Sequence, residues 1–128
     1  MTQLPRVLSL MKKSRRDLAT AERVLDISPE QAARMGYMAA FHAAHAALLA
    51  VTGKEPKTHR GTRVAFGELV LKEERLGPEL GRFIASAYES KDIADYQTEY
   101  DVDRASAATV IAGAREVLER VSAFLEAS

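Results

Sequence analysis

Apolar residues recur at spacings of three and four along almost the whole chain, a period that is typical of amphipathic helices. The first of these segments is predicted to run from about Pro5 to about Asp26. After a central stretch described below, two further helices are predicted, from about residues 59–62 to Arg75 and from Pro78 to about Tyr96. A fifth begins after Asp103, which can cap its first turn. No run alternates with period two between turns, so the pattern favours an all-α protein.

The stretch between Ser28 and Gly53 departs from this one-sided pattern. It holds nine alanines together with methionine, phenylalanine, leucine and valine, so apolar side chains face almost every direction around the helix axis. A helix that is apolar all round is a buried helix. Ser28 is a suitable N-cap, Pro29 suits the first helical position, and Gln31 is expected to complete a capping box. Gly53 can end the helix in the left-handed conformation. We therefore expect this helix at the centre of the fold.

The chain shows no internal repeat and no linker long enough to separate two domains. Its 128 residues are enough for one domain with a sizeable core. We expect a single domain over residues 1–128, built as an up-and-down bundle of four to five helices with short connections.

Charge and cysteine content narrow the classes of function. Lysine plus arginine balance aspartate plus glutamate at 18 each, so any affinity for nucleic acid must come from a local patch. The chain has no cysteine, which excludes disulfides, thiol catalysis and thiolate metal sites. We expect a cytoplasmic protein. No membrane span is expected, because two histidines and an arginine interrupt the most apolar helix.

The densest positive charge is the run Lys12, Lys13, Arg15 and Arg16 on the first predicted helix. Two interpretations are open. The run is either a solvated helix face, which is the commoner case, or a patch that contacts phosphate groups.

Histidines are the main candidates for chemistry. His42 and His45 lie on the central helix, where a histidine is more often a hydrogen-bonded core group than a ligand or a base. Arg34 shares a helix stripe with His45 but stands about three turns away, so the two cannot act on one atom from the same chain. His59 lies beside Lys57 and Arg60 at a helix start, where an anion could bind; a capping or packing role is the alternative.

The sequence predicts neither a metal site nor a catalytic nucleophile. His42 and His45 are three residues apart, but no Glu-x-x-His pair accompanies them. There is no glycine-rich phosphate loop, and serine, histidine and aspartate have no recognisable nucleophile context. We expect no cofactor.

Three pieces in a fixed order carry a resemblance to a known family. They are ARMGYMAAFHAAHAALL at residues 33–49, THRG at 58–61, and Lys91 followed by ADY at 94–96. This series resembles the HEPN domain in its small stand-alone prokaryotic form, over most of the chain. The sequence departs from the family pattern twice. Met38 replaces an aromatic residue, and Lys91 stands where arginine is usual, so a bidentate contact there becomes a point-charge contact.

The resemblance implies a helical bundle, frequent dimerisation and a role beside a small nucleotidyltransferase-type protein in toxin–antitoxin or related systems. Some HEPN proteins are metal-independent ribonucleases that use an Arg-x(4–6)-His motif. The segment from Lys91 to Tyr96 most resembles that position in order along the chain, but it offers lysine and Asp95. Arg34 precedes His42 by eight residues, which is outside the spacing.

We therefore expect a non-catalytic HEPN binding module and assign no catalytic residue. The expected contact surface comprises Lys91, Asp95, Tyr96, His59, His42 and Arg34. The expected partners are a second copy in a homodimer, a nucleotidyltransferase-type protein, and a nucleotide or RNA. A ribonuclease toxin is the alternative function, and a purely structural dimer is a third.

Overall fold

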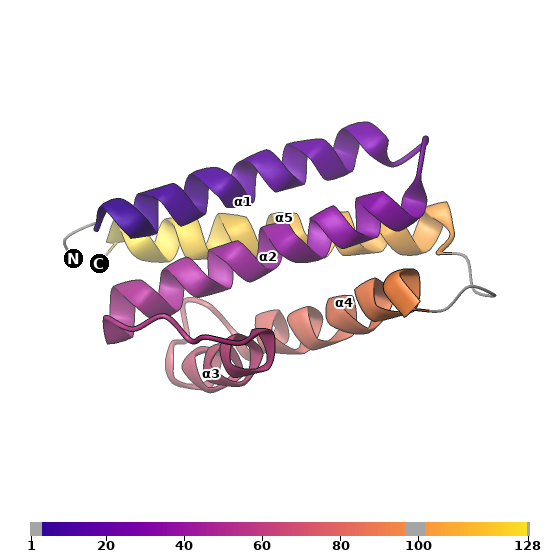
Figure 1. Cartoon of the computed structure of the whole chain (residues 1–128). Coiled ribbons are helices and arrows are strands. Elements are labelled where there is room, and N and C mark those ends of the chain that lie inside the picture. Colours follow the sequence, from indigo (N-terminus) through magenta and orange to yellow (C-terminus); the bar gives the residue numbers. More distant parts are fainter. Residues whose placement is uncertain (1–3, 97–101, 128) are drawn as a thin grey trace.

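The computed structural model describes the backbone of residues 4–96 and 102–127, and their side chains except those of Ser90 and residues 93–96. These residues form five helices and no strand: α1 (Pro5–Val24), α2 (Pro29–Thr52), α3 (His59–Lys72), α4 (Pro78–Tyr96) and α5 (Arg104–Ala127). Figure 1 shows the long helices α1, α2 and α5 running alongside one another, with α4 on the other side of α2 and the shorter α3 crossing near the end of α2. The expected all-α bundle is confirmed.

Both ends of α2 follow from local chemistry. The Ser28 hydroxyl accepts a hydrogen bond from the Gln31 N–H at 3.3 Å, as expected of an N-cap. The expected capping box is incomplete, because the Ser28 N–H donates to the Val24 carbonyl and the Gln31 side chain accepts from Arg34 instead. At the other end Gly53 has φ of 74° and donates its N–H to the Leu49 carbonyl.

Two helices end earlier than their periodicity predicted. Helix α1 ends at Val24 rather than near Asp26, because the N–H groups of Ile27 and Ser28 both donate to the Val24 carbonyl and turn the chain toward α2. Helix α3 ends at Lys72 rather than near Arg75. Apolar spacing alone does not reveal such short turns, because they are made by backbone hydrogen bonds.

The turns that open α4 and α5 match the sequence signals. Gly77, directly before α4, has φ of 89°, a conformation that glycine adopts at low cost. Asp103 caps α5 by accepting a hydrogen bond from the Ser106 N–H at 2.7 Å.

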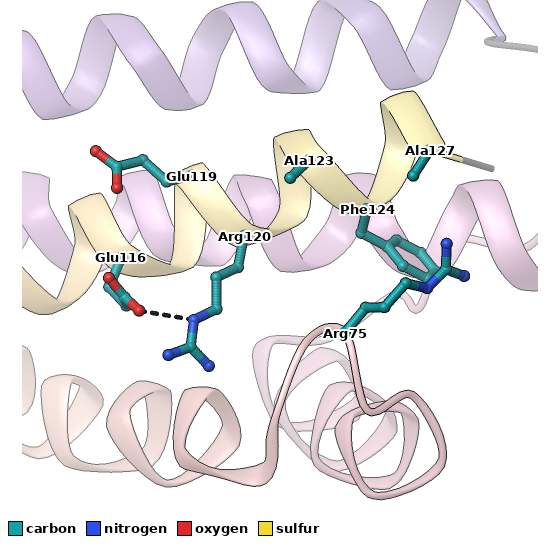
Figure 2. A pocket seen from close by; sticks show the side chains of 7 residues that line it. All are labelled: Arg75, Glu116, Glu119, Arg120, Ala123, Phe124 and Ala127. Atoms are coloured by element: carbon teal, nitrogen blue, oxygen red, sulfur yellow. Dashed lines mark hydrogen bonds and ion pairs between the residues drawn. The ribbon is translucent and has the colours of Figure 1, made fainter.

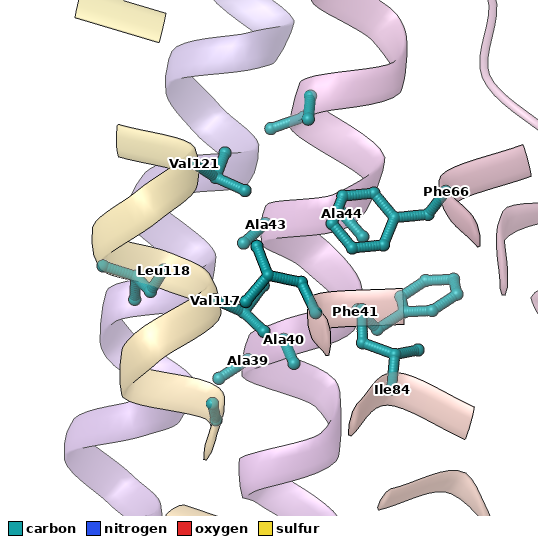
Figure 3. Packing of buried hydrophobic residues seen from close by; sticks show 14 of the residues in the cluster. Ala39, Ala40, Phe41, Ala43, Ala44, Phe66, Ile84, Val117, Leu118 and Val121 are labelled. Carbon is teal, nitrogen blue, oxygen red and sulfur yellow. The ribbon is translucent and has the colours of Figure 1, made fainter. Parts of the chain in front are cut away.

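Helix α2 contacts each of the other four helices. Its alanines at positions 39, 40, 43 and 44 are at most 1% exposed, and in Figure 3 larger side chains from α3, α4 and α5 surround them. Those side chains are Phe66, Ile84, Val117, Leu118 and Val121. The small alanines let the neighbouring helices come close, and their neighbours supply the bulk that fills the core.

Of the helices in the described residues, α2 alone is long and apolar enough to cross a membrane. Its most apolar 18-residue window is 67% buried by the rest of the bundle. The apolar character of α2 is therefore accounted for by its place in the core.

Candidate ligand-binding site

Four rings from three helices form an aromatic cluster: Tyr37 and Phe41 of α2, His59 of α3 and Tyr88 of α4. The ring of Phe41 stacks on the His59 imidazole with centroids 4.2 Å apart. The Tyr37 ring lies 5.6 Å from Tyr88, and its hydroxyl lies 3.2 Å from Nδ1 of His59. Tyr37 and Phe41 lie one turn apart on α2, and this spacing places both rings on one side of the helix.

Two cations lie against the Tyr88 ring. The Arg63 guanidinium carbon lies 3.6 Å from its centroid and Lys91 Nζ lies 5.8 Å from it, both within the range of a cation–π contact. Nη1 of Arg63 is buried and has no hydrogen-bond partner among the described residues. Tyr37 and Phe41 are buried, so the faces left for a ligand are those of the exposed His59 and the half-buried Tyr88. The site combines these with two positive charges and one buried donor that lacks a partner among the described residues.

Burial and these cations set the protonation states. Partial burial lowers the pKa of His59, and the charges of Lys91 and Arg63 lower it further, so the imidazole is neutral at physiological pH. Burial raises the pKa of Tyr37, so its hydroxyl keeps its proton. A phenol that donates to Nδ1 of a neutral imidazole leaves the imidazole proton on Nε2.

The structure brings together only part of the predicted contact surface. His59 stacks on the Tyr37 ring, Lys91 lies over the Tyr88 ring, and these two tyrosine rings are in contact. Asp95 and Tyr96 lie in the last turn of α4, and their side chains are outside the described part of the chain. Arg34 donates to Gln31 in the first turns of α2.

His42 lies in the seam between α1 and α2, and its ring also contacts Phe41 of the aromatic cluster edge-on, with centroids 5.6 Å apart. Its Nε2 lies 3.4 Å from Oδ2 of Asp17, although neither ring nitrogen makes a hydrogen bond with the described residues. Burial lowers the pKa of His42 to about 4, with the positive charge of Lys13 as the next cause. Burial also raises the pKa of Asp17. The imidazole is therefore a neutral group in the seam between α1 and α2. His42 is buried as predicted, but the predicted hydrogen bond of a core histidine is not made within the described residues.

His45 lies beside the connection between α2 and α3. Its Nε2 is 3.2 Å from Oε1 of Glu55, and Arg6 of α1 is 3.1 Å from the same oxygen. The Phe41 ring contacts His45 edge-on, with centroids 5.7 Å apart. His45 therefore joins the aromatic cluster to the Glu55 carboxylate.

The sequence alone identified neither Arg63 nor Tyr88 as a site residue. A weak signal exists in the spacings. Arg63 follows His59 by four residues and Lys91 follows Tyr88 by three, so each pair shares a helix face. The spacings within α3 and α4 cannot show that these two faces meet.

The positive run on α1 is solvated. Lys12, Lys13, Arg15 and Arg16 are all exposed, while Ser14 among them is buried and donates to the Ala39 carbonyl at 2.6 Å. This exposure agrees with the interpretation of the run as a helix face in water.

A hollow of about 380 Å³ lies at the end of α5, beside the connection between α3 and α4 (Figure 2). Arg75 covers the Phe124 ring there, with 4.7 Å between guanidinium carbon and ring centroid. The Arg120 guanidinium bonds to Glu116, Glu79 and the Leu76 carbonyl. Because its arginine donors already have partners within the bundle, we assign this hollow no ligand. Within the part of the chain that the structure describes, no three histidines or acidic residues gather as a metal site would need.

Two comparisons with known proteins bear on identity. The model of the HEPN domain matches residues 7–124, nearly the whole chain. A search of curated proteins finds no match.

Proposed function

We propose, because the chain belongs to the HEPN domain family, that it is a non-catalytic binding module for a nucleotide-containing ligand. The proposed site is the aromatic cluster with Arg63 and Lys91. The observation that carries the proposal is Nη1 of Arg63, a buried donor without a hydrogen-bond partner among the described residues. Buried donors are nearly always satisfied in folded proteins, and a phosphate oxygen of a ligand would satisfy this one.

The other groups of the site suit the same ligand. Lys91 adds a second positive charge next to Tyr88, and His59 is exposed with a neutral imidazole. Aromatic and imidazole rings stack on bases without regard to sequence, and cations hold the phosphate. A nucleotide has both a base, which can stack on a ring of the cluster, and a phosphate, which Arg63 and Lys91 can bind.

The ligand can reach this site free or carried by a protein. We propose that the second route involves a nucleotidyltransferase-type partner in a toxin–antitoxin-like pair, that the module acts as a homodimer, and that it works in the cytoplasm. Family membership supports the partner and the homodimer, and the absence of cysteine is the ground for the cytoplasm.

Calorimetry with AMP tests the binding proposal. We expect saturable binding that weakens by about tenfold in Lys91→Ala and in Arg63→Lys, which keeps the charge but loses the planar donor set. The matched control is Lys72→Ala, which removes an exposed positive charge at the end of α3. Equal binding by all variants, or an equal loss in the control, would contradict the proposed site.

One observation favours the alternative, a metal-independent ribonuclease toxin. His59 is exposed and its lowered pKa leaves it neutral. In the other tautomer, whose Nδ1–H donates to the Tyr37 hydroxyl, Nε2 can accept a proton from a ribose hydroxyl beside two cations. A lysine, Lys54, precedes it by five residues, the spacing at which ribonuclease HEPN domains have arginine. Cleavage of RNA by metal-free protein, abolished by His59→Ala, would replace the binding module with this function.

A further inference from the structure

A second hollow lies between the end of α2 and the start of α3, and the proposed nucleotide site does not use it. Its volume is about 560 Å³, which is within the range of small-molecule sites. Apolar side chains of Leu48, Pro56 and Ala65 line it together with the two lysines Lys54 and Lys57. We call it the lysine pocket.

The lysine pocket carries an uncompensated positive charge. Glu55 also lines it, but the Glu55 carboxylate is already held by Arg6 at 3.1 Å and lies 3.2 Å from His45. Neither Lys54 nor Lys57 has an ion pair with any described residue. The site therefore favours an anion, and Thr52 at its edge is occupied in hydrogen bonds to the Leu48 carbonyl and the Lys54 backbone.

Its apolar part is aliphatic. Leu48 is 3% exposed, and no aromatic ring lines the pocket, so it has no platform on which a base could stack. Val51 and Val64, which adjoin lining residues in the sequence, are 41% and 52% exposed. Aliphatic surface of this kind next to cations suits a hydrocarbon chain with a charged end.

We propose that the lysine pocket binds a small amphipathic anion, an aliphatic chain that ends in a carboxylate or phosphate group. The chain lies against Leu48, Pro56 and Ala65, and the anionic end lies between Lys54 and Lys57. None of the residues that line the lysine pocket belongs to the aromatic cluster, and the proposal does not rest on the proposed function.

A titration followed by methyl NMR tests the proposal. Octanoate, octyl phosphate, octanol and acetate are added in turn while the methyl resonances of Leu48 and Ala65 are monitored. We expect saturable shifts with octanoate or octyl phosphate, and the tighter of these two identifies the head group. Octanol and acetate should bind at least several-fold more weakly, because each lacks one half of the ligand.

Two double variants with the same change in charge provide the control. Lys54→Gln with Lys57→Gln should weaken binding of the amphipathic anion by about fivefold or more, and the loss should shrink at high salt. Lys12→Gln with Arg15→Gln, on the exposed face of α1, should leave it unchanged. Octanol binding as tightly as octanoate, or an equal loss in both double variants, would overturn the proposal. So would shifts by AMP at Leu48 and Ala65 that depend on Lys54 and Lys57, since they would make the pocket part of the nucleotide site.

Discussion

Neutral His42 in the seam between α1 and α2 links stability to pH. Burial lowers its pKa to about 4 in the folded protein, whereas an exposed histidine titrates near 6.5. Between these two values the unfolded chain binds a proton at His42 that the folded chain does not. The free energy of unfolding must therefore fall as the pH falls through this window. The lowered pKa values of His45 and His59 act in the same direction, and the raised pKa of Asp17 acts against them.

We expect the free energy of unfolding to drop by about 2 kcal/mol between pH 7.5 and pH 5 on account of His42. Urea denaturation at the two pH values measures this drop. In His42→Gln, which cannot titrate, most of the drop should disappear. A variant with the pH dependence of the parent would show that His42 is protonated in the fold.

The surroundings of His42 show which properties of a single residue can be predicted from the sequence. The apolar surroundings of His42 on α2 predicted a buried, hydrogen-bonded histidine. It is buried, but neither ring nitrogen has a hydrogen-bond partner among the described residues. Its neighbour Asp17 is a charged residue on the buried face of α1. Helix period does not determine which two helices meet at which register, so it does not bring Asp17 to His42. The contact of Arg63 with the Tyr88 ring could not be predicted for the same reason, because the two residues come from different helices.

At the scale of the helices, two glycines in helix interiors have opposite surroundings. A Cβ at Gly67 of α3 would meet nothing within 4 Å. A Cβ at Gly113 of α5 would overlap the ring of Phe83 from α4. Glycine weakens a helix relative to alanine. Alanine at position 67 would therefore stabilise α3, whereas position 113 requires glycine because the Phe83 ring packs against it.

Gly67→Ala should raise the free energy of unfolding by roughly 0.5–1 kcal/mol. Gly113→Ala should lower it, because the Phe83 ring must leave its place. Chemical denaturation of both variants gives the two signs. Stabilisation by Gly113→Ala would mean that α4 and α5 do not approach each other as described.

Helix ends were predictable where side chains cap them and less so where backbone bonds decide. Ser28, Gly53 and Asp103 mark their ends as the sequence indicated. The ends of α1 and α3 shifted by a few residues, because turn hydrogen bonds compete there with the last helical ones. A capping side chain can be recognised from the sequence because it acts on neighbouring residues. The balance between turn and helix hydrogen bonds also depends on where the next helix starts.

For the whole molecule, assembly is the property that a single chain does not display. We expect a homodimer at micromolar concentration, as family membership suggests. Ile27 and Leu71 are 83% and 75% exposed, so apolar surface is available for contact between copies. Light scattering on the purified protein measures the mass. A monodisperse monomer would remove the dimer and leave the fold untouched.

The contact between α2 and α5 also sets an order of events in folding. Helices α1 and α2 meet across a short turn, whereas α5 reaches α2 only after the chain from Gly53 to Asp103 has closed into a loop. Closing a loop costs more entropy as it lengthens, so we expect the α1–α2 hairpin to form before the rate-limiting barrier and α5 to dock after it. In stopped-flow experiments Leu10→Ala on α1 should then slow refolding, while Val117→Ala on α5 should mainly accelerate unfolding. If Val117→Ala slows refolding as much as Leu10→Ala does, the two ends of the chain meet before the barrier is crossed.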